Sequence, residues 1–490
     1  MRLSRRRVLL GTTAVLLTGC TADPDPSRSQ TSQRTNTPNA RQNAEEAVIF
    51  DLSLEIVDRF RPFALVADGF EVEAPASPGP NGMFRGEVGP VAPYVAIELR
   101  VSGDAEDVAA GLTTEDGDHV LVRWSAATSR LWLSVRQGGR TRLLRRVTFE
   151  AGGAFGLAFA LCENQVTALV DTGDGWRPLL TERAKVAALV DLRREDVLSR
   201  YSYAWSSTGV DDARAGVFGM TGLRDPHLVQ ETDGTPYIRG GRAYLTWTCA
   251  GLGFFQQAHF TVWSLDPADP TDMRLEAQIF SRRDGLVLGD HAGQLVRSGD
   301  EWIVATSSWG DFEPGSIHVR HTTTTDDVLT GVHVLDTERS PMPTEHGSWD
   351  PALTRLDETW YVGFVESPSQ DPFDFHPALA STTSGTWHDD LSLVAAADSL
   401  HQAEGPIIAT VGGDTWLLAS DGDDRNYPVF DLTGRRVGRL DAPYPTNIPH
   451  PQLLADPGGG WWMVTFDGTQ FTEDVMGYGG HGDVVVLHST

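Results

Sequence analysis

The chain has 490 residues, of which 40% are hydrophobic and 9% aromatic, enough apolar material for more than one packed core. Its 39 lysine and arginine residues stand against 67 aspartate and glutamate residues, so the formal net charge is -28 at pH 7. This composition excludes a disordered polymer, and so acidic a chain repels phosphate backbones, which excludes nucleic acid as an expected partner.

The first twenty residues are expected to form an export signal that takes no part in the fold. Residues 4–10 read SRRRVLL and resemble a twin-arginine signal. The apolar run 8–17 is too short to span a bilayer, and residues 17–20, LTGC, resemble a lipobox in which Cys20 is lipidated. We therefore expect a protein of the bacterial cell envelope, extracytoplasmic and lipid-anchored to the cell membrane through Cys20.

Residues 21–44 are expected to be a disordered tether, because they are mostly Ser, Thr, Pro, Asn, Gln and Arg with almost no apolar residue. The two other cysteines, Cys162 and Cys249, fall in different predicted domains. We expect two buried free thiols, and an interdomain disulfide is the alternative.

Residues 45–214 alternate apolar and polar residues in short segments between Gly, Asp and Asn turns, a pattern typical of antiparallel strands with one solvated face. The expected strands are 94–101, 119–125, 131–136, 142–149, 154–162 and 165–171. The pattern predicts a β-sandwich of the jelly-roll type, and residues 111–120 resemble the concanavalin-like sandwiches attached to carbohydrate-active enzymes. Such a domain either binds sugar or braces the rest of the protein, and the sequence leaves both open.

From residue 215 to residue 490 one short pattern occurs five times, in most copies followed by a turn and an aromatic strand. The copies begin at Arg224, Asp290, Trp349, Ala403 and Pro449, and the strands that follow are 243–247, 301–307, 359–364, 414–419 and 460–466. A repeat of about 45 to 65 residues built from short strands predicts a five-bladed β-propeller. The whole chain is therefore expected to be all-β.

Three of the copies carry a carboxylate at what reads as the same point, in Asp225, Asp350 and Glu404. Because the innermost strands of a propeller line its central channel, these acids should meet at one mouth. Hydrolysis of a glycosidic bond needs one protonated carboxyl group and one ionised carboxylate, and crowding drives the pKa values of neighbouring acids apart. The alternative is that these acids only cap turns.

With this order of acids the C-terminal part resembles the five-bladed family 43 glycoside hydrolases and their relatives in families 32, 62 and 68. In that family an Asp opens the first blade, an Asp the third, and a Glu, often followed by Gly-Pro, the fourth. The resemblance implies that Asp225 is the general base, that Glu404 is the general acid, and that Asp350 tunes the pKa of the acid and orients the sugar. It further implies an inverting reaction on a pentose-containing oligo- or polysaccharide, such as an arabinofuranosyl one.

The same resemblance implies that His450, which opens the fifth blade, ligates or lies beside a calcium ion; no other cofactor is expected. A lone imidazole is a poor ligand for a hard cation, so a hydrogen bond in the channel is the alternative role of His450. His291, which opens the second blade, is expected to contact the substrate or to fix Asp225, and a filling role is equally open.

Sugar sites use aromatic faces to stack on rings and arginine to hold hydroxyl groups. The residues expected to bind substrate near the mouth are Arg224, His291, Trp309, Trp349, Arg425 and Tyr427, with Phe254, Phe255, Phe373 and Phe375 as further aromatic candidates.

Other functions stay open. Residues 224–226, Arg-Asp-Pro, resemble a motif of retaining fructan- and levan-cleaving enzymes, so the mechanism would be retaining if the repeat order were misread. The same fold would also suit a noncatalytic sugar-binding lipoprotein or a phosphorolytic enzyme. The sequence has no Gly-x-Ser-x-Gly motif, nucleotide-binding loop or zinc-type spacing that would indicate another chemistry.

Overall fold

The computed structural model describes residues 48–75, 77–79, 82–471 and 481–489. The predicted signal, the lipidation site Cys20 and the predicted tether lie outside the described residues. The all-β fold class is confirmed, since the described residues form mainly strands, with two one-turn α-helices, α1 (Ala184–Ala187) and α2 (Glu195–Leu198), and three short 3-10 helices. No helix among the described residues has the length and apolar character needed to cross a membrane.

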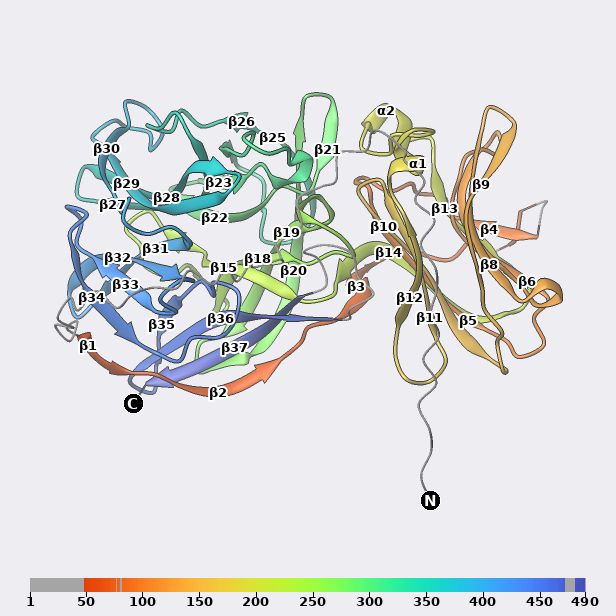
Figure 1. Ribbon diagram of the computed structural model, residues 1–490, viewed down its shortest axis with the longest axis horizontal. Coiled ribbons are helices and arrows are strands. Elements are labelled where there is room, and N and C mark those ends of the chain that lie inside the picture. Colours follow the sequence, from red (N-terminus) through yellow and green to blue (C-terminus); the bar gives the residue numbers. More distant parts are fainter. Residues whose placement is uncertain (1–47, 76, 80–81, 472–480, 490) are drawn as a thin grey trace, which may run out of the picture.

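Two six-stranded antiparallel sheets form the sandwich at one end of the molecule (Figure 1). The sheet nearer the propeller contains, in spatial order, β12 (Arg177–Glu182), β11 (Gln165–Asp171), β10 (Phe155–Cys162), β5 (Tyr94–Val101), β14 (Val210–Met220) and β3 (Ala64–Glu71). The outer sheet contains β4 (Met83–Arg85), β13 (Ser202–Ser206), β6 (Asp107–Thr113), β7 (His119–Ser125), β8 (Arg130–Gln137) and β9 (Arg140–Thr148). Alternate residues of both sheets, such as Val95 and Val122, form one buried apolar cluster between them.

The second part of the molecule consists of five sheets. The first contains β15 (Leu223–Leu228), β18 (Arg242–Cys249), β19 (His259–Asp266), β20 (Asp269–Arg283) and β21 (Leu286–Leu288), with β17 (Ile238–Arg239) and β25 (Gly331–Asp336) at its sides. The second contains β16 (Gln230–Glu231), β22 (His291–Ser298), β23 (Glu301–Ser307), β24 (Val319–Thr324) and β26 (Glu338–Arg339). The third contains β27 (Gly347–Leu356), β28 (Thr359–Gln370), β29 (Phe373–Thr382) and β30 (Ser392–Ala396).

The fourth sheet contains β31 (Ala403–Val411), β32 (Asp414–Asp421), β33 (Tyr427–Phe430), β34 (Arg436–Asp441) and β1 (Val48–Ser53). The fifth contains β35 (Gln452–Ala455), β36 (Trp461–Gln470), β37 (His481–Ser489) and β2 (Glu55–Phe60). Apolar clusters join each sheet to the next, and one of them joins the fifth sheet to the first. The five sheets are therefore the blades of a propeller.

Two glutamines each accept a hydrogen bond from the backbone of a neighbouring blade. Gln294 of the second blade accepts a hydrogen bond from the backbone N–H of Leu353 in the third, at 2.7 Å. Gln452 of the fifth blade accepts one from the backbone N–H of Leu228 in the first, at 2.9 Å. The fifth blade thus meets the first as the second meets the third.

The predicted start of the sandwich at residue 45 is wrong for the first two strands. β1 runs parallel to β34 and β2 runs antiparallel to β37, so both strands belong to propeller blades and the sandwich begins with β3. Figure 1 shows β1 and β2 along the lower edge of the propeller, beside the C-terminal strands. Without β1 and β2, the fourth and fifth blades would each end in an unpaired strand edge. The N-terminal residues pair with these two edges.

We expect Leu54→Ala to lower the free energy of unfolding by about 3 kcal/mol. Leu54 links β1 to β2, is 2% exposed and lies in the cluster between the fourth and fifth blades. The midpoint of thermal unfolding measures the loss. Ile56→Ala is the matched control, because Ile56 on β2 is 48% exposed and should cost little; equal losses for the two variants would show that this segment does not stabilise the propeller.

The sandwich packs against the first blade and holds one of its loops. Tyr94 donates a hydrogen bond to the backbone oxygen of Gln256 at 2.7 Å, and Gln257 donates one to the buried Glu163 at 2.9 Å. An apolar cluster with members from β5, β10 and β20 completes the contact. The bracing role left open by the sequence is therefore present on this side of the sandwich.

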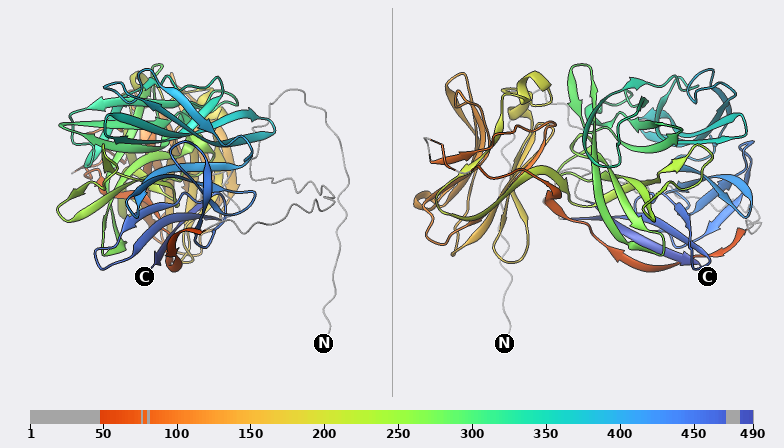
Figure 2. Two further views of the ribbon diagram at one scale, coloured as in Figure 1. Left: turned by 90° about the vertical axis from the view of Figure 1, so that its left-hand side faces the viewer. Right: turned by 180° about the vertical axis from the view of Figure 1, so that it is seen from behind.

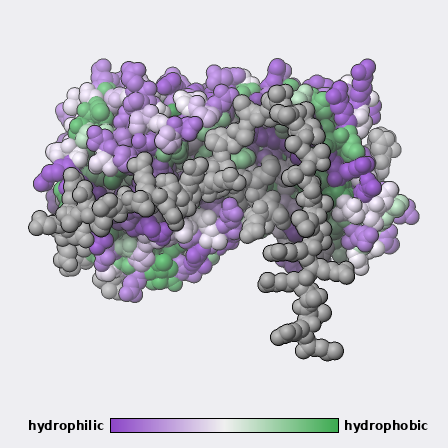
Figure 3. Space-filling view, viewed as in Figure 1, coloured by the Kyte–Doolittle hydropathy of each residue, from purple (hydrophilic) through white to green (hydrophobic). Residues whose placement is uncertain are grey.

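The two described cysteines are free and buried, as expected. Burial raises the pKa of both thiols to about 12, so neither Cys162 nor Cys249 is a reactive thiolate near neutral pH. Figure 3 shows a largely hydrophilic surface over both parts of the molecule, with scattered hydrophobic patches.

Candidate functional site

The first strands of four blades each contain a bulge, and these bulges position the predicted acids. The pairing register skips two residues in β15, β22, β27 and β31. The first skipped residue has a left-handed backbone in every case: Asp225 (φ 52°), Ala292 (φ 52°), Asp350 (φ 52°) and Gly405 (φ 64°). A bulge turns the backbone so that a side chain is redirected at the end of the strand.

One sequence interpretation is corrected by this register. Asp225 and Asp350 occupy the first skipped position, but Glu404 lies one residue earlier, and Gly405 takes the place equivalent to theirs. Glu404 is instead equivalent to Arg224, His291 and Trp349. The three carboxylates are therefore not at the same point of the repeat, although they do come together in space.

Backbone hydrogen bonds between blades fix these positions. Thr248 of the first blade accepts the N–H of Ala292 at 3.1 Å, and Ser307 of the second accepts the N–H of Asp350 at 2.9 Å. The N–H of Gly405 donates to the Asp350 carboxylate at 3.1 Å. A side chain at residue 405 would have a Cβ within 2.4 Å of the His450 ring, so only glycine fits there.

A pocket of about 630 Å³, including its opening to solvent, lies at the mouth where the blades meet. Its charged and imidazole side chains are Arg224, Asp225, His291, Asp350, Glu404 and His450. Its aromatic side chains are Phe255, Trp309, Trp349, Phe373 and Phe375. All three predicted catalytic acids thus line one pocket, together with four of the six predicted substrate-binding residues and the predicted metal ligand.

Glu404 is held protonated near neutral pH. Burial, followed by the charge of Asp225, raises the pKa of Glu404 to about 8. The indole N–H of Trp349 donates to the Glu404 carboxyl group at 3.3 Å, which orients the group without reversing the shift. A carboxylic acid in this state can give a proton to a leaving oxygen.

Asp225 has the opposite character. Burial acts to raise the pKa of Asp225, but the charges of Arg224, His450 and His291 outweigh burial and hold the pKa below its ordinary value. Burial also lowers the pKa values of both histidines, that of His291 to about 3, so they are neutral near pH 7. The causes that remain near neutral pH are therefore the charge of the buried Arg224 guanidinium and a hydrogen bond from Thr248, which together keep Asp225 ionised.

Asp350 is coupled to both other acids. Burial raises the pKa of Asp350, and the charges of Glu404 and Asp225 raise it further. Because Asp225 is ionised, Asp350 and Glu404 cannot both lose their protons at neutral pH without strong repulsion. The ionisation of Asp350 therefore depends on the charge of Glu404.

The aromatic side chains form one continuous wall of the pocket. Trp309 stacks on Phe255 with ring centroids 4.6 Å apart and meets Trp349 edge-on at 5.4 Å. Trp349 in turn stacks on Phe373 at 5.7 Å. Such a wall offers flat apolar surface to one face of a sugar ring.

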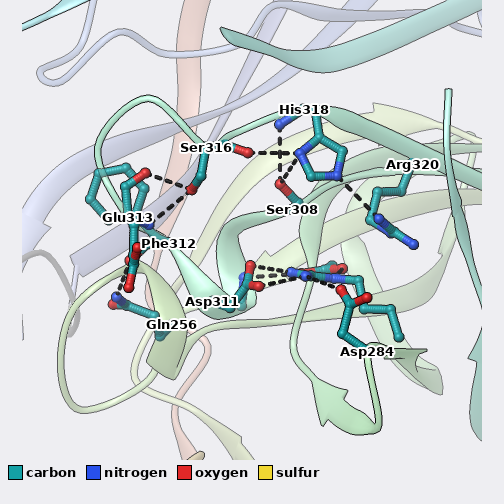
Figure 4. A network of polar contacts seen from close by, with 12 residues as sticks. Gln256, Asp284, Ser308, Asp311, Phe312, Glu313, Ser316, His318 and Arg320 are labelled. Atoms are coloured by element: carbon teal, nitrogen blue, oxygen red, sulfur yellow. Dashed lines mark hydrogen bonds and ion pairs between the residues drawn. The ribbon is translucent and has the colours of Figure 1, made fainter. Parts of the chain in front are cut away.

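A polar network fixes the loop that carries Trp309 (Figure 4). Asp311, at the end of the short 3-10 helix η3 (Trp309–Asp311), forms an ion pair with the buried Arg283, which also binds Asp290 at 2.8 Å. Asp290 accepts the backbone N–H of Gly310 at 3.0 Å. Further along the loop, the side chains of His318 and Ser308 share a hydrogen bond, as Figure 4 shows. The Asp of the second copy therefore positions an aromatic loop and does not enter the pocket.

Two substrate-binding predictions are wrong. Tyr427 is buried between the fourth and fifth blades and donates a hydrogen bond to the backbone oxygen of Pro443 at 3.3 Å. Arg425 lies over the ring of Tyr444, 5.3 Å from its centroid, and binds the Tyr444 backbone oxygen. Neither residue lines the pocket. Phe254 is likewise absent from the lining, whereas its neighbour Phe255 is present.

Sequence reasoning missed four residues of the lining, Ala292, Gln402, Asn447 and Ile448. Ala292 lies inside the second blade opening, Gln402 lies just ahead of Glu404, and the other two lie just ahead of His450. The left-handed backbone of Asn447 (φ 66°) and Ile448 (φ 51°) turns this segment toward the mouth. The position of these residues in or next to a predicted blade opening was the feature of the sequence that could have identified them as pocket residues.

His450 lies between two of the acids. Its Nε2 atom is 3.8 Å from an Asp225 oxygen and 3.6 Å from an Asp350 oxygen, and it has no hydrogen-bond partner among the described residues. Within the part of the chain that the structure describes, no group of three or more His, Cys, Asp or Glu is arranged to hold a metal ion. The side chains at His450 therefore do not by themselves form the oxygen-rich cage that calcium prefers.

No protein-family model matches the chain, and no curated protein matches it. Among solved structures it is similar to a thermostable family-43 glycoside hydrolase, at 14% identity over 55% of this chain and 89% of that one, with a TM-score of 0.38. It is also similar to the α-L-arabinanase of Penicillium chrysogenum complexed with arabinobiose, at 9% identity over 80% and 97% of the two chains, with a TM-score of 0.37. A family 117 glycoside hydrolase from the marine bacterium Zobellia galactanivorans matches at 9% identity over 55% and 84%, with a TM-score of 0.39. What the chain does is decided by the chemistry of its own site.

Proposed function

We propose that this protein is a glycoside hydrolase whose active site is the pocket at the propeller mouth. The observation that carries the proposal is the pair of carboxyl groups in opposite states, with Glu404 protonated and Asp225 ionised beside Arg224. A glycosidic bond breaks when an acid protonates the leaving oxygen while a base activates water or a carboxylate attacks carbon. The aromatic wall beside the acids supplies the surface on which a sugar ring stacks.

In the proposed mechanism Glu404 gives its proton to the leaving oxygen and Asp225 takes a proton from the attacking water. Asp350 is a positioning residue, because its carboxylate accepts the backbone N–H of Gly405 next to the acid, and a negative charge on Glu404 raises the pKa of Asp350. Arg224 keeps Asp225 ionised and lines the pocket, where its guanidinium can hold a sugar hydroxyl. We assign no step to a metal ion, and calcium beside His450 stays a prediction.

The finer parts of the proposal rest on the resemblance seen in the sequence. They are the inverting course, a pentose-containing substrate such as an arabinofuranosyl polymer, and attachment to the outer face of the cell membrane through Cys20. Three carboxyl groups in one pocket favour hydrolysis over simple sugar binding, because burying several acids together costs stability and strongly shifted pKa values cluster at catalytic sites.

Hydrolysis of arabinofuranosyl and xylosyl aryl glycosides, with the first-formed anomer read by NMR, tests the proposal. We expect cleavage with inversion at the anomeric carbon. Retention of configuration would make Asp225 a nucleophile and favour the fructan-type alternative. Binding of these sugars without cleavage of any of them would overturn the enzymatic proposal in favour of a sugar-binding protein.

We expect kcat/KM to fall as the pH rises through about 8. As the pH is lowered, we expect kcat/KM to stay constant until the pH is below the ordinary aspartate pKa. The sign follows from the two groups: the raised pKa of Glu404, about 8, keeps the acid protonated below that pH, and the lowered pKa of Asp225 keeps the base ionised in mildly acidic solution. A pH profile with a non-ionising aryl substrate measures both limbs. An alkaline limb near the ordinary glutamate pKa of about 4.3 would show that Glu404 is not the acid.

A further inference from the structure

Three neighbouring strands of the outer sheet of the sandwich are rich in arginine. In a chain with a formal charge of -28, residues 119–148 contain no aspartate or glutamate. They contain seven arginines: Arg123, Arg130, Arg136, Arg140, Arg142, Arg145 and Arg146. These residues make up β7, β8 and β9, at the end of the outer sheet of the sandwich.

The strand register sorts these side chains onto two faces. Val122 and Leu133 point into the sandwich core, so the residues that alternate with them point outward. Arg123, Trp132 and Arg146 pair across the three strands and form one outward row. Arg136 and Ser134 lie on the same face of β8.

This outward row lies in a depression of about 870 Å³, including its opening to solvent. Trp132 lines it between Arg123 and Arg146, and Leu143, which is 53% exposed, lines it too. Aromatic and apolar surface flanked by guanidinium groups is unusual on a free protein surface, where large apolar side chains are normally covered.

The arginines of the depression are not neutralised by the protein. Among the described residues, none of Arg123, Arg130 and Arg146, the three arginines that line the depression, forms an ion pair within 4.0 Å, although the charge of Asp107 acts on Arg123 from a greater distance. Arg145, which is not part of this row, does pair with Glu182 at 3.1 Å. The nearest acid in sequence, Asp118, instead accepts the backbone N–H groups of Gly138 and Gly139.

The position of the depression leaves it open to a ligand. The other sheet of the sandwich packs on the propeller, whereas the outer sheet lies at the far end of the molecule, as Figures 1 and 2 show. A guanidinium binds a carboxylate through two parallel hydrogen bonds, and an indole face stacks on a sugar ring. An extended chain of acidic sugars satisfies both groups at once.

We propose that the outer face of β7, β8 and β9 is a binding site for an anionic polysaccharide whose sugars carry carboxylate groups. Trp132 stacks on one ring while Arg123 and Arg146 bind carboxylates on either side of it. A membrane surface fits this face less well, because Trp132 is half-buried in a depression and is not a protruding side chain that could insert into a flat bilayer. The site is separate from the propeller pocket and does not depend on the proposed hydrolysis.

Titration calorimetry of the whole protein with polygalacturonate, a uronate polymer, tests this site, with neutral arabinan as the comparison polymer. We expect binding of the uronate polymer that weakens as salt is added, and at least tenfold weaker binding of arabinan. Combined Arg123→Gln and Arg146→Gln should raise Kd by about tenfold or more, since each substitution removes a charge-assisted hydrogen bond to a carboxylate. Trp132→Ala should raise Kd about tenfold with an unchanged dependence on salt.

The matched control is the combination of Arg177→Gln and Arg200→Gln, which removes the same charge from exposed positions of the sandwich that do not line the depression. We expect its Kd to stay within about twofold of wild type, as for other surface substitutions. Equal weakening by the control would reduce the effect to overall charge and overturn the proposal. Equal affinity for arabinan, or binding to phosphatidylglycerol vesicles without binding to polygalacturonate, would overturn it as well.

Discussion

Asp225→Asn is expected to lower kcat by about 10³-fold, with a much smaller change in KM. The amide has the shape of the carboxylate but cannot take a proton from water. The buried Arg224 that holds Asp225 ionised would remain in place, so the pocket should keep its form. Initial rates on an aryl arabinofuranoside or xyloside, fitted over a range of concentrations, separate the two constants.

Asp357→Asn is the matched control for this variant. Asp357 is exposed, lies in a turn between β27 and β28, and has the same left-handed backbone (φ 53°), so the substitution makes the same chemical change far from the pocket. Its rate should equal that of wild type within about twofold. A loss of less than tenfold in Asp225→Asn would remove Asp225 from the role of base.

Much of the architecture could be predicted from local patterns. Strands such as β5, β7, β11 and β23 have the predicted bounds, because alternating residues between Gly and Asp turns have a single way to bury their apolar face. The repeat of blade openings predicted that Asp225, Asp350 and Glu404 would meet, and they line one pocket. Convergence follows from topology alone and needs no knowledge of side-chain geometry.

The position of the acids within the repeat could not be predicted by aligning the carboxylates. The bulge sets the register, and in three blades its second skipped residue is a proline: Pro226, Pro351 and Pro406. Proline has no N–H to donate to the ladder, which suits a bulge. Alignment of these prolines places Glu404 one residue ahead of the two aspartates and predicts the correct offset.

Long-range pairing explains the other errors. Nothing in residues 48–60 indicates that they pair with strands almost 400 residues later, since an exposed strand with mixed residues fits the edge of either part. Arg425 and Tyr427 follow a turn near the mouth, but the backbone turns them toward Tyr444 and Pro443. Each error concerns a partner that is distant in sequence or on another strand.

Glu404→Gln is expected to lower kcat/KM by about 10³-fold on oligosaccharides and by only about tenfold on a dinitrophenyl glycoside. An alcohol leaving group needs the proton of Glu404, whereas dinitrophenolate leaves without one. The glutamine keeps the contact with the indole N–H of Trp349 through its amide oxygen, so the acid is lost while its surroundings are preserved. The fall in activity above about pH 8 should also disappear, because glutamine has no proton to lose where the Glu404 carboxyl group, with its pKa of about 8, loses one.

Glu358→Gln is the corresponding control, since Glu358 is exposed in the turn before β28 and should leave both substrates unaffected. The ratio of the two losses, rather than either loss alone, identifies the role of Glu404. A general acid slows the poor leaving group far more than the good one, whereas a residue that only binds substrate slows both alike. Equal losses on the two substrates would therefore leave Glu404 as a binding residue, and the persistence of the alkaline limb in Glu404→Gln would move the acid to Asp350, its coupled neighbour.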